Sequence, residues 1–251
     1  MWPPVPSSAG ASMLALLFQF DRSQRDTPET IADERLDGEA LTAIRELRAP
    51  PGVAGYFSAW KTNAGDNVEL DYKLSLFRLE IRYRGMIHPN VQPFLREARL
   101  EADWTDCFSI RHVPHPSALG RRRQERKAVL LRAIESDPAW LRYHWFLGYS
   151  LYREGAHHPA QQYLSHVVKA WSPAFPVETL NSATVLASRL AGSGRRSDAR
   201  ALVADALRFL DAVGEDFEVK INRSLVTWFG NVHAVLGMHD PEPLVPPVFS
   251  H

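Results

Sequence analysis

The residues best suited to catalysis or metal binding are an acidic pair, Asp33 and Glu34, in the stretch IADERLDGEALTAIREL. Neighbouring carboxylates suit a hard divalent cation such as Mg²⁺ or Mn²⁺, because such ions bind oxygen ligands. The same pair also suits the first turn of a helix, where the helix dipole favours negative charge. The stretch by itself leaves both interpretations open, one a metal site and the other a structural feature.

Other polar side chains could take part in chemistry further along the chain. His88 follows a strand-like stretch and a glycine in RGMIHPN, a place where a lone histidine is more often structural or exposed. His112 and His115 have a spacing of three that suits a metal, yet no cysteine or third histidine lies nearby, which disfavours zinc. Asp103, expected with Asp106 in a loop, is a candidate for acid–base catalysis, since a general base needs only to reach the proton it removes.

The composition is that of a globular protein with one large or two small domains. Its 251 residues are 45% hydrophobic and 23% charged, which is enough apolar material for a core. Lys+Arg 29 and Asp+Glu 29 cancel, and we therefore expect no nucleic-acid partner. Cys107 is the only cysteine, which favours a reducing compartment. No apolar run approaches the ~20 residues needed to cross a bilayer, and we expect a cytoplasmic protein without a transmembrane segment.

The N-terminal half is expected to mix helices and strands. Residues 1–26 form a lead-in, partly disordered, whose first dozen residues are rich in Pro, Ser, Ala and Gly, with one short buried strand expected in MLALLFQFD. A helix is predicted to begin at the Asp37-Gly38-Glu39 stretch, and one apolar face of it is predicted to carry Leu41, Ile44 and Leu47. Strands are predicted in GYFSAW, LFRLEIRYRG and CFSIRH. Between Phe77 and Arg84, apolar and charged residues alternate, which indicates a strand with one solvent-facing side.

The C-terminal half, residues 118–238, is expected to be helical throughout, followed by a Pro-rich tail at 239–251. A shift of 39 residues superimposes similar residues, the pairs being Leu147 and Leu186, Leu151 and Leu190, Gly155 and Gly194, Ala160 and Ala199, and Leu164 and Val203. This pattern resembles the tetratricopeptide (TPR) motif of paired antiparallel helices, which repeats every ~34 residues. A plain helical bundle is the alternative.

The order of segments from residue 31 to residue 165 resembles the C-terminal part of family 2 glycosyltransferases with the GT-A fold. The segments that carry the resemblance are ADERLDGEALTAIRELRAPPGVAGYFSAWKT, LFRLEIRYRGMIHPNVQP, FSIRHVPHP and RRRQERKAVLLRAIESDPAWLRYHWFLGYSLYREG. The ADER run resembles the acidic loop of that family, whose carboxylates hold a divalent cation against the donor diphosphate. The resemblance implies a partial GT-A-like α/β region at 27–117 and TPR-like helical hairpins at 118–238, an α+β protein.

The resemblance also implies roles for the candidate residues. Asp33 and His88 would belong to a Mg²⁺ or Mn²⁺ site, and Glu34 would be catalytic and face the acceptor. His112 and His115 would bind the substrate. The substrates would be a nucleotide-sugar donor and an unknown acceptor. Two departures matter: Ile31 stands where the first Asp of the loop is expected, and only thirty residues precede the loop where the family has about a hundred. We therefore expect weak or undetectable nucleotide binding by this chain. The rival hypothesis is a non-enzymatic interaction module whose helical region binds a protein.

Overall fold

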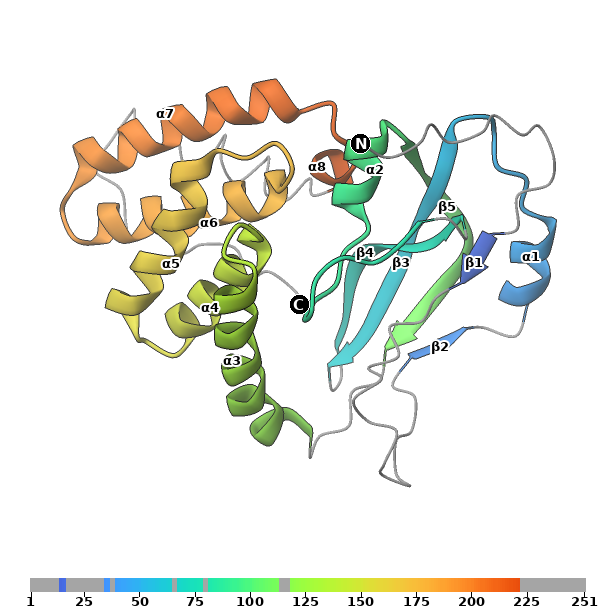
Figure 1. Cartoon of the computed structure of the whole chain (residues 1–251), viewed down its shortest axis with the longest axis horizontal. Helices are drawn as coiled ribbons and strands as arrows, with labels where there is room; N and C mark the ends of the chain where they lie inside the picture. The colour runs from blue at the N-terminus through green and yellow to red at the C-terminus, as the bar shows by residue number, and fades with distance from the viewer. Residues whose placement is uncertain are drawn as a thin grey trace. The chain divides into compact units, whose positions relative to one another are not determined.

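A computed structural model of the chain describes residues 14–16, 34–36, 39–64, 67–78, 81–112 and 118–221. Within these ranges the protein is α+β, as expected, with eight helices and one five-stranded sheet (Figure 1). The chain divides into two compact units, each described here by itself. Unit 1 comprises Met1–Tyr83 and Phe94–Pro114, and unit 2 comprises Arg84–Pro93 and His115–His251. No helix in the described ranges is both long and apolar enough to span a membrane.

Unit 1 is built on a mixed sheet with the strand order β1-β4-β3-β5-β2. The two long strands β3 (Val53–Ala64) and β4 (Asn67–Arg78) are antiparallel, whereas β5 (Glu101–His112) runs parallel to β3. The helix α2 (Gln92–Ala98) lies between β4 and β5 in the chain. The short edge strands β1 (Leu14–Leu16) and β2 (Glu34–Leu36) are antiparallel to β4 and β5 respectively.

The helix α1 (Ala40–Glu46) covers an apolar part of this sheet, but with a different face from the predicted one. Ala40, Ile44 and Leu47 pack against the core formed by Tyr56, Trp60, Leu76, Phe108 and Ile110. Leu41 is 52% exposed, so its predicted place on the buried face was wrong. Successive residues of a helix are about 100° apart, which groups Ala40 with Ile44 and Leu47 and leaves Leu41 on the side.

Two strand predictions needed correction. The alternation from Phe77 onward predicted a strand to Arg84, yet β4 ends at Arg78 and the described residues 81–83 are not in a strand. Both Phe77 and Ile81 are fully buried, so the apolar positions of this pattern reflect burial and not one continuous strand. Asp103 and Asp106 were expected in a loop, but both lie within strand β5.

Unit 2 is helical throughout its described part after residue 117, as predicted. Its helices are α3 (Ala118–Ser136), α4 (Leu141–Arg153), α5 (His157–Ala170), α6 (Pro176–Gly192), α7 (Arg196–Val213) and α8 (Phe217–Ile221). Short connections link consecutive helices, and each of α3 to α6 packs on the helix that follows it (Figure 1). The segment Arg84–Pro93, which precedes most of α2 in the chain, also belongs to this unit.

The 39-residue repeat of the sequence is also a repeat of backbone geometry. Gly155 and Gly194 follow α4 and α6 with φ values of +78° and +79°, the left-handed region that glycine adopts without steric cost. The amide of Ala156 donates to the Leu151 carbonyl at 2.9 Å, and the amide of Arg195 donates to the Leu190 carbonyl at the same distance. The turns α4–α5 and α6–α7 therefore share one helix-terminating geometry, in which the left-handed residue allows a later amide to satisfy a carbonyl of the last turn.

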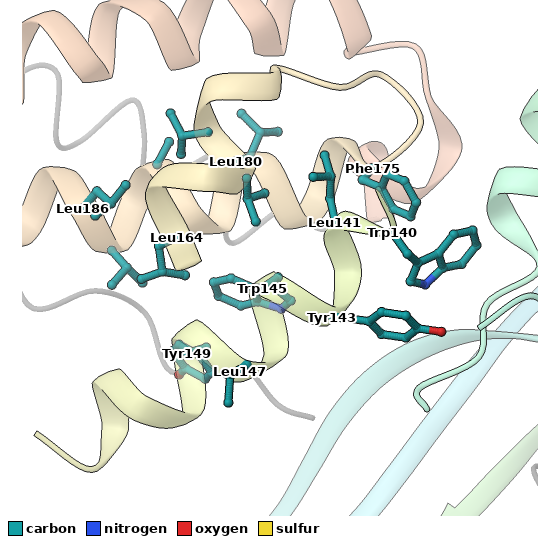
Figure 2. Close-up of a cluster of buried hydrophobic side chains, with 14 of the residues drawn as sticks. Trp140, Leu141, Tyr143, Trp145, Leu147, Tyr149, Leu164, Phe175, Leu180 and Leu186 are labelled. Carbon is teal, nitrogen blue, oxygen red and sulfur yellow. The ribbon is translucent and has the colours of Figure 1, made fainter. Parts of the chain in front are cut away.

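The core of unit 2 lies where these hairpins pack together. Figure 2 shows Leu164, Leu180 and Leu186 gathered on one side of the cluster, with Trp145 between them and Tyr143. Leu147 and Ala160, predicted from the repeat to be buried at a helix crossing, are 2% and 0% exposed. Gly148 is buried as well, and a Cβ atom built on it would lie 2.9 Å from the Leu164 side chain. The small residue at position 148 thus permits the close approach of α4 and α5.

Candidate functional site

The sheet of unit 1 brings two of the predicted site residues together at the end of β5. Glu34 in β2 is the register partner of His112, the last residue of β5. Residues directly opposite one another in an antiparallel pair are the nearest cross-strand neighbours in a sheet. The acidic segment is therefore paired with the strand end that carries His112. It forms a strand at Glu34 and not the first turn of a helix.

The neighbouring strand β3 contributes two further residues next to His112. Thr62 is its register partner in the parallel β3–β5 pair, and the Thr62 hydroxyl lies 3.4 Å from His112 Nδ1. The ring of Trp60 lies 5.8 Å from the imidazole centroid, and Trp60 itself is buried against α1. The hydroxyl can donate to or accept from the ring nitrogen, so it fixes the orientation of the imidazole in either tautomer. We call Glu34, Trp60, Thr62 and His112 the sheet-end cluster.

Asp103 does not belong to the sheet-end cluster. Its register partner in β3 is Tyr56, six positions before Thr62, which corresponds to roughly 20 Å along a strand. Its carboxylate accepts a hydrogen bond from the Trp104 amide at 2.7 Å. Burial raises the pKa of Tyr56, and the negative charge of Asp103 raises it further. Asp103 therefore acts on the opposite end of the sheet, away from Glu34 and His112.

His88 lies in unit 2, in the loop between the bridge partners Arg84 and Asn90. Its backbone has φ +49°, a left-handed conformation that is uncommon for a residue with a side chain. Its ring is stacked on Phe146 of α4, with centroids 3.7 Å apart and planes 16° apart. Its carbonyl oxygen accepts a hydrogen bond from Arg142 Nε at 3.1 Å. The structure thus holds His88 in one defined conformation on the helix α4.

The remaining predicted residues and the predicted metal site are only partly covered by the structure. Asp33 and His115 lie outside the described residues. Within the described ranges, no group of three His, Cys, Asp or Glu side chains is arranged to hold a metal ion. A divalent cation in proteins takes several oxygen ligands, so the described residues do not by themselves form such a site.

Several residues of the sheet-end cluster and of the surroundings of His88 were not predicted as site residues. Thr62 and Trp60 resemble ordinary strand residues in GYFSAWKT, and only the parallel register of β3 and β5 puts them beside His112. Arg142 and Glu178 are charged residues at the starts of α4 and α6, and no local pattern in the sequence indicates that they pair. Phe146 belongs to a helix rich in aromatic residues, most of which lie in the core of unit 2, and its sequence context does not distinguish it from them.

Comparison with known protein families and with curated proteins gave no match to this sequence.

Proposed function

We propose that this chain is a glycosyltransferase-like protein of the family 2, GT-A type, which transfers a sugar from a nucleotide-sugar to an unknown acceptor. The observation that carries the proposal is the register of β2 and β5, which puts Glu34 opposite His112. The acidic run and the end strand, both of which the resemblance names, are 78 residues apart in the sequence (112 minus 34) and become neighbours in the sheet. The helical hairpins that follow the sheet unit in the chain also support the proposal.

In this proposal the sheet-end cluster contacts the acceptor and the transferred sugar. Glu34 is the candidate general base, since a carboxylate within hydrogen-bond reach of an acceptor hydroxyl can take its proton as the new glycosidic bond forms. His112, oriented by Thr62, donates or accepts a hydrogen bond with the substrate. A bound Mg²⁺ or Mn²⁺, with Asp33 as a ligand, would neutralise charge on the departing diphosphate. His88 lies in unit 2 and has no assigned place in this cluster.

The test is a thermal-shift and NMR titration of the full chain with UDP, GDP and their sugars in the presence of Mn²⁺. The two departures from the family's loop predict weak or undetectable binding, whereas the proposal requires binding that saturates, and at ligand 100 times its Kd the stabilisation is then ~2.7 kcal/mol. Glu34→Gln and His112→Gln should abolish the NMR shifts. Asp103→Asn is the matched control on the same strand pair, because it is distant from the cluster, and it should bind as the wild type does. Absence of any saturable shift with every nucleotide would overturn the proposal.

A second candidate function is protein binding by the helical unit. The observation that favours it is the repeated hairpin geometry at Gly155 and Gly194, since stacked helical hairpins build extended surfaces used for binding. A peptide-array screen of the full chain tests this function. Arg153→Ala changes an exposed position on α4 and tests whether that surface takes part in peptide binding. Peptide binding without any nucleotide effect would make the protein an interaction module.

A further inference from the structure

The loop that carries His88 is a closed structure docked on α4. The amide of Arg84 donates to the Asn90 carbonyl at 3.0 Å, and the amide of Asn90 donates back to the Arg84 carbonyl at 2.9 Å. These two bonds close a loop of five residues, 85–89, between them. Asn90 also caps the following segment, because its side-chain oxygen accepts from the Gln92 amide at 3.0 Å. The loop therefore has a fixed base.

An aromatic shelf on α4, formed by Trp140, Tyr143 and Phe146, receives this loop. Trp140 is the N-cap residue of α4, and Tyr143 and Phe146 lie within the helix. Side chains three positions apart are neighbours on a helix surface, so the three residues form one continuous surface. Figure 2 shows Trp140 and Tyr143 at one end of α4, away from Leu164 and Leu186. The guanidinium of Arg84 lies 5.2 Å from the Trp140 ring, and the amide of Met86 donates to the Tyr143 hydroxyl.

Arg142 links this loop to the second hairpin. Its Nε donates to the His88 carbonyl, and its guanidinium lies 5.0 Å from the Phe146 ring on which His88 is stacked. Its Nη1 forms an ion pair with the carboxylate of Glu178 in the first turn of α6. The Glu178 side chain is only 3% exposed. A buried carboxylate without a positively charged partner is strongly destabilising, so the ion pair with Glu178 keeps the Arg142 side chain in place.

A left-handed conformation at a histidine has a conformational cost that the surroundings must offset. The contacts around His88 supply this: a charge-assisted hydrogen bond on its carbonyl and an aromatic stack on its ring. Both contacts come from α4, and one of the two residues that make them is locked by α6. The conformation of His88 is thereby set by the helical unit and not by the strand that precedes the loop.

We propose that Arg142 and Phe146, with Glu178 locking Arg142, are positioning residues that hold the candidate residue His88 in its left-handed conformation on α4. Any role of His88 in transfer rests on the proposed function, whereas the positioning itself does not.

The experiment compares two double variants of the full chain, in the absence of any nucleotide. Arg142→Met with Glu178→Met removes the ion pair together with the bond to His88, and replacing both charges avoids leaving one buried alone. Lys127→Met with Glu154→Met is the matched control, because that pair joins α3 to the end of α4 without contacting the loop. Phe146→Leu keeps the side chain apolar and removes the stack.

The readouts are amide hydrogen exchange at Met86 and Asn90 and the NMR shifts of the His88 ring protons. We expect exchange to rise by about tenfold or more in the Arg142/Glu178 variant, as for loss of a hydrogen bond to a charged group, and to stay unchanged in the control. The ring-proton shifts should move toward unfolded values in the same variant and in Phe146→Leu. Arg142→Lys keeps a charge for Glu178 but lacks the guanidinium fork, and it should keep the melting temperature while altering the His88 shifts.

Unchanged exchange and unchanged ring shifts in the Arg142/Glu178 variant would overturn the positioning role. An equal change in the Lys127/Glu154 control would overturn it too, because the effect would then be general loosening of the helices. These outcomes are read in the free protein. Failure of nucleotide-sugar binding in the titration above would therefore remove the transferase role and leave the positioning result standing.

Discussion

Gly148 and Leu164 meet where α4 crosses α5, and the crossing depends on the missing side chain of Gly148. A Cβ atom at position 148 would lie 2.9 Å from both Cγ and Cδ2 of Leu164 and 3.1 Å from Cβ of Tyr163. Leu164 is fully buried and has little space into which to retreat. At Gly155, which follows α4, an added Cβ has no atom within 4 Å. The two glycines of this hairpin are therefore needed for different reasons, close packing at one and backbone conformation at the other.

Gly148→Ala should lower the free energy of unfolding by up to about 2 kcal/mol. Overpacking a tight core contact costs roughly 1–3 kcal/mol, and the helix-propensity gain of about 1 kcal/mol that alanine brings offsets only part of this cost. Urea unfolding measures the change. Gly192→Ala in α6 is the matched control, since a Cβ there has no atom within 4 Å, and it should be neutral or stabilising. A stabilised Gly148→Ala variant would contradict the close crossing.

Ala160→Trp and Ala199→Trp should destabilise the protein by similar amounts, on the order of 1–3 kcal/mol each. Both alanines are 0% exposed and occupy equivalent places, 39 residues apart, in the two hairpins. Ala170→Trp, at an exposed position on α5, is the control and should leave the melting temperature nearly unchanged. An unchanged melting temperature in either buried variant would argue against the repeat register.

Gly155→Ala and Gly194→Ala should each cost about 1–2 kcal/mol, because a left-handed backbone is unfavourable for a residue with a Cβ atom. Space is not the cause, since an added Cβ has no atom within 4 Å at either position. Their φ values, +78° and +79°, are nearly the same, so we expect equal costs within error. Calorimetry or urea unfolding measures both. A large difference between the two variants would show that the turns are not equivalent.

The stability of unit 2 should fall on mild acidification because of His144. Burial lowers the pKa of His144, the neighbouring His166 lowers it further, and the hydrogen bond to the Pro138 carbonyl acts in the opposite direction. The unfolded chain has the ordinary value of 6.5 and so binds the proton more readily. The stabilisation is complete above about pH 6.5 and is lost as the pH falls toward the folded pKa.

His144→Gln should therefore lose less stability than the wild type between about pH 7.5 and about pH 5.5, since a glutamine does not titrate in this range. Its amide can still donate to the Pro138 carbonyl. Urea unfolding at the two pH values gives the comparison. Equal pH dependence in His144→Gln and the wild type would exclude His144 as the titrating group.

The helical half of this protein could be predicted from residue spacing alone. The leucine, glycine and alanine spacings that predicted the hairpins are local, because a helix places residues three and four apart on one face whatever it packs against. Leu147, Ala160 and the glycine turns therefore lie as the 39-residue repeat predicted. The strand segments were also recognised, but their ends were not, since β4 ends at Arg78 and not at Arg84 as predicted.

Which residues meet across the fold could not be predicted in this way. Alternation in a strand specifies a face and not a partner, so the pairing of Glu34 with His112 follows from the order of strands in the sheet. Leu41 was assigned to the wrong face for a similar reason, since the packing of α1 selects among apolar residues of similar spacing.

His88 is the clearest case of a residue whose environment depends on tertiary structure. Its sequence neighbours are strand-like, yet Arg142 and Phe146, more than fifty residues later, fix its carbonyl and its ring. Contacts between residues distant in sequence depend on the folded arrangement of whole elements, which no local pattern encodes.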